Sequence, residues 1–225
     1  MSNAFINSFN GSALNTPLSA AVSAGDLLAV VLQWNLDTGT AALTDNLGNT
    51  YTAISQVHNT FDGVSLSVFQ TKVTVAGTAT ITPTGTTATY SMMGASWSGL
   101  DLCALGAAAA GQYQSTGAII GTDTLTSGNV TPGSQPGVLF GAGLDNPFST
   151  SRVAAGTGFT DRTPTTPLVK MTQESLVITS TSAIAATFSP QTGDVSSPRG
   201  LAVGAFFADT VIAPTSYFMS SDTYF

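Results

Sequence analysis

The chain of 225 residues is long enough for one large β-sandwich with a sizeable core. Charged residues make up only 8% of it, against roughly 25% in an average soluble domain, so uncharged polar residues must form most of the surface. The net charge of −7 and the pI near 4.1 argue against nucleic-acid partners, because phosphate binding requires clustered Lys and Arg. Surface helices are disfavoured as well, since two lysines and one glutamate cannot line polar helix faces.

The cysteine content and the N-terminus bear on the cellular setting. A single cysteine, Cys103, excludes an intrachain disulfide and a zinc cluster, and we interpret it as a small buried side chain. The segment Met1–Phe9 lacks the charged and apolar regions of a signal peptide, and no run of about 18 apolar residues could span a bilayer. We therefore expect no membrane association. Release by cell lysis, as for virion components, explains the missing leader; loss of a leader is the alternative.

Short apolar or alternating runs bounded by Gly, Pro, Asn and Asp predict strands along most of the chain. The first clear run is Asp26–Trp34, whose continuous apolar character predicts a central strand buried on both faces. Next, Leu43–Ile54 predicts a hairpin, because Asp45–Asn49 is a turn cluster between two β-prone arms.

The following segments predict further strands. Between Val64 and Val68, apolar residues alternate with Ser65 and Ser67, which predicts a half-buried strand, and a later change of phase predicts a bulge near Phe69–Thr71. The remaining predicted strands are Ala79–Thr82, Thr87–Trp97, Thr122–Leu125, Val138–Leu144, Glu174–Thr179, Ala183–Phe188 and Leu201–Phe207. In the last strand, one face carries Leu201, Val203, Ala205 and Phe207.

Strands at such short intervals predict an all-β fold, an antiparallel two-sheet sandwich that is jelly-roll-like, with a C-terminal extension. The run Ala107–Ala110 is too short for a stable helix and is expected to be a loop. The Pro/Thr-rich segment Thr160–Pro167 is expected to be a long surface loop. Because no linker divides the chain, we predict one sandwich domain over residues 1–209 and an aromatic tail over residues 210–225.

The tail carries bulky apolar side chains that would be a liability in water on a free terminus. Either they pack on the chain's own body or they dock on a neighbouring subunit. The second alternative makes them assembly contacts, and the residues concerned are Tyr217, Phe218, Met219, Tyr224 and Phe225.

The sequence shows no constellation typical of catalysis. His58 is the only histidine and lies in a polar link, so we interpret it as a solvated loop residue. The segment Gly94–Gly99 misses the G-x-S-x-G spacing by one residue, and no helix follows it. Eleven aspartates and one glutamate permit a carboxylate pair, but most aspartates lie beside turn-forming residues, where Asx side chains cap turns. We predict that the chain is not an enzyme.

The sequence contains residues that could form two further kinds of site, a calcium site and a sugar-binding platform. Asp45–Asn49 supplies oxygens that suit calcium, yet it lacks the EF-hand pattern, so a turn is preferred over a calcium site. Trp34 and Trp97 each end an apolar strand and are expected in the core, with a sugar-binding platform as the alternative. No phosphate-cradling motif is present, and we expect no metal and no cofactor.

Four segments together resemble a β-sandwich module of tailed-phage virion proteins and bacterial secreted proteins: Ala24–Trp34, Leu43–Thr52, Met92–Asp101 and Gln135–Gly143. The resemblance covers roughly residues 20 to 207. It implies a jelly-roll-like fold that acts as a decoration, fibre or adhesion element, and it carries over no catalytic residues. The aromatic tail after Asp209 departs from the module.

These observations predict a non-enzymatic structural protein of a phage virion, located in the extracellular particle. We expect a head decoration or cement protein, or a fibre component, that self-associates and binds another virion protein on a capsid or tail surface. The alternative is a carbohydrate-binding or adhesin module, whose partner would be a glycan.

Overall fold

The computed structural model describes residues 3–11, 13–35, 41–59, 63–85, 89–104, 108–114, 124–133, 136–144, 153–164, 171–189 and 199–210. All regular secondary structure in these ranges is β. No helix that could cross a membrane is present among the described residues. The first eight strands are β1 (Ala4–Asn10), β2 (Leu18–Val22), β3 (Leu27–Asn35), β4 (Ala42–Asp45), β5 (Thr52–Asn59), β6 (Val64–Lys72), β7 (Gly77–Thr84) and β8 (Tyr90–Ser98). The next eight are β9 (Ala108–Gln114), β10 (Leu125–Thr126), β11 (Gly137–Leu144), β12 (Ala154–Ala155), β13 (Thr160–Asp161), β14 (Met171–Ile178), β15 (Thr187–Ser189) and β16 (Arg199–Ala208).

The first eight strands form a jelly roll, which we call unit 1. Its large sheet has the order β1-β8-β3-β6-β5, and its small sheet has the order β2-β7-β4. Strand β1 pairs with β8, β2 with β7 and β3 with β6, all antiparallel, so the pairs are nested as in a long hairpin that has been rolled up. That nesting produces the two facing sheets of a jelly roll.

The last eight strands repeat this topology and form unit 2. The large sheet of unit 2 has the order β13-β14-β11-β16-β9, and its small sheet has the order β10-β15-β12. Subtracting eight from each strand number reproduces both orders of unit 1. In both units the corresponding strand pair places apolar residues opposite each other in the core, Leu27 and Trp97 in unit 1 and Val138 and Phe207 in unit 2. The predicted all-β antiparallel sandwich is therefore confirmed, and its jelly-roll order occurs twice.

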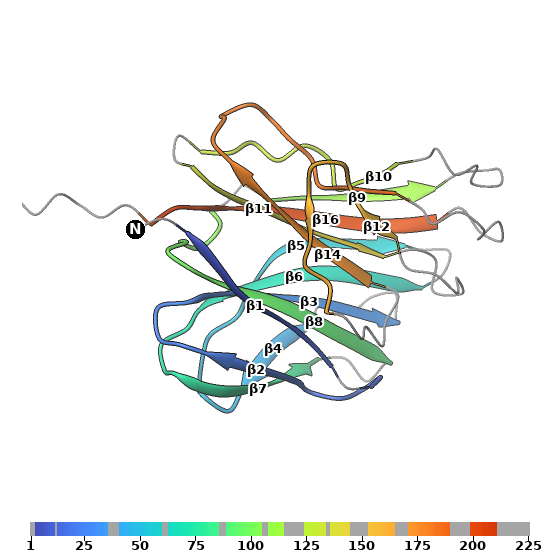
Figure 1. The fold of residues 1–225 in the computed structure, drawn as a ribbon. Coiled ribbons are helices and arrows are strands. Elements are labelled where there is room, and N and C mark those ends of the chain that lie inside the picture. The colour runs from blue at the N-terminus through green and yellow to red at the C-terminus, as the bar shows by residue number, and fades with distance from the viewer. Residues whose placement is uncertain are drawn as a thin grey trace, which may run out of the picture.

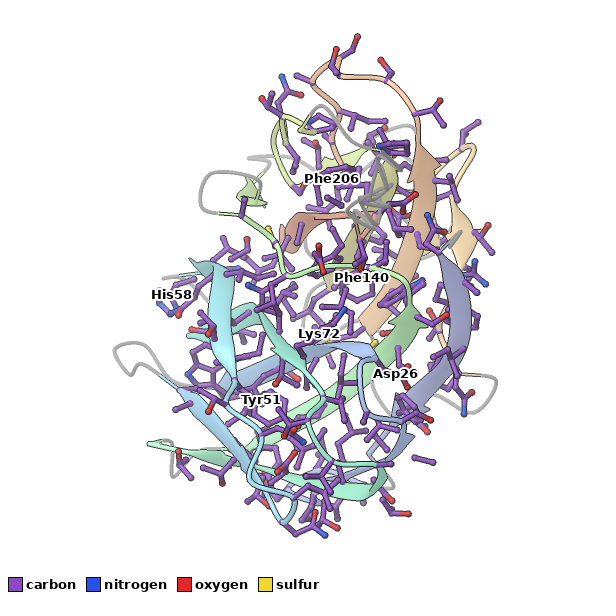
Figure 2. All side chains as sticks on the ribbon, turned by 90° about the vertical axis from the view of Figure 1, so that its left-hand side faces the viewer. Asp26, Tyr51, His58, Lys72, Phe140 and Phe206 are labelled. Carbon is purple, nitrogen blue, oxygen red and sulfur yellow. The ribbon has the colours of Figure 1, made fainter. Side chains whose placement is uncertain are left out.

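The four sheets stack as four layers, with the large sheets in the middle and a small sheet outside each (Figure 1). The large sheets enclose a shared core to which both units contribute. Its aromatic centre is Trp97, Phe140 and Phe207, with ring centroids 5.5 to 6.5 Å apart. Phe140 lies near the middle of the molecule (Figure 2). The two units are thus joined through one apolar layer.

Strand β3 confirms the predicted central strand that is buried on both faces. Leu27, Ala29 and Val31 face the shared core, whereas Leu28 and Val30 face the core between the two sheets of unit 1. The predicted face of β16 is confirmed in the same way, since its four alternating apolar residues all belong to the shared core. Continuous apolar runs are buried on both faces here because each large sheet has another sheet on either side.

Three local predictions were wrong. The segment Leu43–Ile54 is not a hairpin, because β4 pairs with β7 and β5 pairs with β6, so the turn passes the chain from the small sheet to the large one. Strand β6 pairs with β3 without interruption, and the irregularity lies in β5, between Ala53 and Ser55. A third prediction, that this strand is half-buried, was also wrong, because β6 lies inside the large sheet and has a core on each face. Its buried Ser67 Oγ donates to Ser55 O at 2.9 Å.

Other differences concern weak strand signals. The run Ala107–Ala110 was expected to be a loop, but Ala108–Ala110 begins β9 because it pairs with β16. Thr160–Asp161, expected in a loop, forms β13 against β14, while residues 165–167 lie outside the described residues. Strands β1 and β2 were not predicted, since their Ser, Asn and Ala residues carry little β-propensity. In each case tertiary pairing overrides the local signal.

Candidate functional site

The Asp45 turn closes on its own side chains. Asp45 Oδ1 accepts hydrogen bonds from the backbone N–H groups of Leu47 (2.9 Å) and Asn49 (3.0 Å). Asp45 Oδ2 accepts from Asn49 Nδ2 and from Tyr51 Oη, both at 2.8 Å. Burial opposes ionisation, but these bonds outweigh it and lower the pKa of Asp45. Each carboxylate oxygen has two donors, which fits the turn interpretation, and Tyr51 acts as a structural donor.

The predicted chemical residues do not gather in one place. His58 was expected in a solvated loop, but it lies on edge strand β5 at the outside of the molecule (Figure 2), with Nδ1 2.8 Å from Ser65 Oγ. Ser96 belongs to the segment Gly94–Gly99, whose spacing comes close to G-x-S-x-G. It lies inside strand β8 and is fully buried. Among the described residues, no group of three or more His, Cys, Asp or Glu could hold a metal ion.

Both tryptophans are core residues, as expected. Trp34 is fully buried between the sheets of unit 1, and Trp97 is 1% exposed in the shared core. Neither ring can serve as a platform for a sugar at the surface. Among the tyrosines, Tyr51 donates to Asp45 and Tyr90 packs against the core of unit 1, while the side chain of Tyr113 lies outside the described residues.

The best-organised surface site is the place where the chain leaves unit 2 for the tail, and we call it the exit anchor. It comprises Gly99–Cys103, Pro136, Asp209 and Thr210. Asp101 N donates to Ala208 O at 2.8 Å, Asp209 N donates to Pro136 O at 2.7 Å, and Thr210 N donates to Gly99 O at 2.9 Å. The connection between the units is thereby bonded to the last strand of the fold.

Side chains strengthen the exit anchor. Thr210 Oγ1 donates to Asp101 Oδ1 at 3.1 Å, and Asn3 Nδ2 donates to Asp209 Oδ1 at 2.5 Å. Lys72 Nζ lies 3.7 Å from Asp101 Oδ1 and also donates to Leu100 O. Because the Lys72 and Asp101 side chains are 34% and 52% exposed, this ion pair contributes little stability by itself. The backbone bonds therefore carry most of the anchoring.

Cys103 belongs to the same region and is buried, as expected. Gln70, 4% exposed, holds it from both sides: Gln70 Nε2 donates to Cys103 O at 3.3 Å, and Cys103 N donates to Gln70 Oε1 at 2.6 Å. Burial raises the pKa of the Cys103 thiol to about 11, against a smaller lowering from a hydrogen bond with the Phe206 backbone. The thiol is thus protonated at neutral pH and is a packing residue.

One residue of interest, Glu174, was not predicted from the sequence. It is the only glutamate of the chain, and it is fully buried in the middle of β14. Its strand contains four consecutive polar residues, Thr172–Ser175, all buried, which a half-buried strand would not tolerate. That polar run inside a β segment was the available signal.

The predicted assembly contacts Tyr217, Phe218, Met219, Tyr224 and Phe225 lie outside the described residues. The described chain ends at Thr210, within the exit anchor, which fixes the point from which the tail begins. Comparisons of the chain with protein-family models, with curated proteins and with solved structures found no match.

Proposed function

We propose that the chain is a non-enzymatic structural protein of a phage virion, either a head decoration or cement protein or a fibre component. It self-associates and binds a capsid or tail surface through another virion protein. The observation that carries this proposal is the jelly-roll strand order, which occurs twice in one chain. Jelly rolls are a common architecture of viral capsid domains.

Two further observations support an assembly role. The chain reaches its apolar tail through the exit anchor, so the position of the tail's first residue is fixed relative to both units. A fixed starting point lowers the entropy that a tail loses when it docks on a neighbour. The low content of charged residues, 8% of the chain, is a second point, since association would have to desolvate few charged groups.

Light scattering after size-exclusion chromatography tests self-association. The full chain is compared with a chain that ends at Thr210, which keeps the exit anchor intact, and with a full-length control in which the five apolar tail residues are replaced by serine. We expect an oligomer for the full chain and monomers for both variants. Identical monomers in all three would contradict tail-mediated assembly.

Co-sedimentation tests the virion setting. Particles from the producing culture are separated on a density gradient, and the chain is detected with an antibody. We expect it in the virion band, and its confinement to the soluble fractions would contradict the proposal.

The alternative function, a glycan-binding or adhesin module, is also compatible with a jelly roll. It would have to use a surface other than Trp34 and Trp97, because both are buried.

A further inference from the structure

Glu174 connects the two sheets of unit 2. Its side chain extends from β14 of the large sheet and is fully buried. Glu174 Oε2 accepts a hydrogen bond from Gly156 N at 2.8 Å, and Glu174 Oε1 accepts one from Thr187 N at 3.1 Å. Gly156 follows β12 and Thr187 begins β15. A single carboxyl group therefore binds two of the three strands of the small sheet.

Among the described residues, one further side-chain bond joins β14 to the small sheet of unit 2, donated by Thr172 Oγ1 to Val153 O beside β12. Strand β15 pairs with β10 over two residues and with β12 over two residues. The described apolar core beneath it comprises five buried residues, whereas the corresponding core of unit 1 comprises fifteen. The two hydrogen bonds that Glu174 accepts, together with the one that Thr172 donates, thus fasten this layer to β14.

The surroundings of Glu174 offer space but no compensating positive charge. A Cβ at Gly141 would lie 3.1 Å from Glu174 Cγ and Oε1, so the glycine leaves room for the carboxyl group. Strand β13 contributes one titratable neighbour, Asp161, which lies directly opposite Glu174 in the register. Strands β10, β11, β12, β15 and β16 contribute no titratable side chain among those described. Arg162 is engaged elsewhere, with Nε donating to Ser175 Oγ at 2.8 Å.

We propose that Glu174 is a pH-sensitive latch that holds the small sheet of unit 2 against the large sheet. The neutral acid is accommodated in the apolar layer. When it loses its proton to solvent, the two N–H donors bind the carboxylate more strongly, but a negative charge remains in that layer beside Asp161. The cost of burying this charge exceeds the gain from the two bonds, and the small sheet opens.

The direction of the pH effect follows from the charge balance. Burial raises the pKa of Glu174, the two backbone hydrogen bonds lower it, and the charge of Asp161 raises it, to about 8 in all, from 4.5. Because the pKa of Glu174 is higher in the folded state than in the unfolded chain, its contribution to the stability of the folded state is complete below pH 4.5. It falls as the pH rises and is lost above about pH 8.

The first experiment uses the unmodified full chain. Since Glu174 is the only glutamate, labelling with glutamate that carries ¹³C at the carboxyl carbon gives one NMR signal to follow against pH. We expect a titration midpoint near pH 8. A midpoint at or below 4.5 would overturn the proposal.

The second experiment reads the latch itself. Hydrogen exchange of peptides covering residues 153–164 and 184–189, corrected for the intrinsic pH dependence, is compared at pH 6 and pH 9. The full chain is expected to lose protection there at pH 9, and Glu174→Gln is expected to show no such change. Asp161→Asn removes a charge that raises the pKa of Glu174, so it should shift both the loss of protection and the NMR midpoint to lower pH. Equal loss in the chain and in Glu174→Gln, or no loss in the chain, would overturn the proposal.

Discussion

Units 1 and 2 have the same strand order but fill their outer layers differently. In unit 1, large side chains such as Trp34 and Phe69 separate the sheets. In unit 2, glycines on β11 and β16 bring the small sheet close: a Cβ at Gly143 would lie 2.6 Å from the Phe188 ring, and one at Gly204 would lie 2.8 Å from Ser127 Oγ. Strand pairing therefore sets the topology, while side-chain size sets the spacing of the layers.

The strand pairings show that the outer layers of the two units contain different kinds of side chain. Phe69 of β6 lies opposite Val30 in unit 1, and Glu174 of β14, the corresponding strand, lies opposite Gly141 in unit 2. Both side chains face the outer layer of their unit. A large apolar side chain in one unit thus corresponds to a buried carboxyl group and a glycine in the other. The buried carboxyl group makes the outer layer of unit 2 sensitive to pH, whereas the outer layer of unit 1 has an ordinary apolar core.

The largest expected effect concerns the shared core. Trp97→Ala removes a ring that packs against Phe5, Phe140 and Phe207, so we expect the free energy of unfolding to fall by about 3–5 kcal/mol. Because both units contribute to this core, hydrogen exchange should accelerate in the large sheets of both.

Trp34→Ala is the matched control for this change. It removes an equally buried indole from the core of unit 1 alone, so the added exchange should be concentrated in unit 1. If Trp97→Ala left the protection of unit 2 unchanged, the description of a shared core would be contradicted.

A smaller effect is expected from the close layers of unit 2. Gly143→Ala places a methyl group against Phe188, and such overpacking costs about 1–3 kcal/mol. Gly133→Ala is the control, because its Cβ would meet nothing within 4 Å. Chemical denaturation of the two variants should separate them clearly, and equal stabilities would argue against close packing as the distinguishing feature of unit 2.

The smallest effect is expected at the Asp45 turn of unit 1. Asp45→Asn removes one acceptor oxygen that Asn49 and Tyr51 share, so a loss of about 1–2 kcal/mol is expected at neutral pH. The folded-state pKa of Asp45 lies below 3.8, so its contribution is present above that pH and disappears as the pH falls further. Tyr51→Phe removes a single donor and should cost less in the same denaturation series. A difference that persisted unchanged at pH 2 would contradict this account.

The sequence predicts the fold class and the central strands well, because continuous apolar runs such as Asp26–Trp34 have few other uses. It does not reveal the repeat, because corresponding strands carry different side chains: β6 places Phe69 in the outer layer of unit 1, whereas β14 places Glu174 in that of unit 2. Partner choice also escapes local reasoning, as the false hairpin at Leu43–Ile54 shows. Nesting depends on contacts between residues far apart in the chain.

Glu174 illustrates the same limit for a site. Its neighbours in space, Gly156 and Thr187, lie 18 and 13 residues away, and no spacing rule links them to a carboxyl group. The exit anchor likewise joins Asp101 to Thr210 across 109 residues. Such sites arise from the topology, so they become visible only once the strand order is known.

Calorimetric unfolding of the full chain tests most directly whether the two jelly rolls are joined through one core. The account predicts a single transition in which the calorimetric enthalpy equals the van't Hoff enthalpy, because neither large sheet can expose its inner face while the other stays folded. Two resolved transitions, or a calorimetric enthalpy well above the van't Hoff value, would show that the units unfold separately and would contradict it.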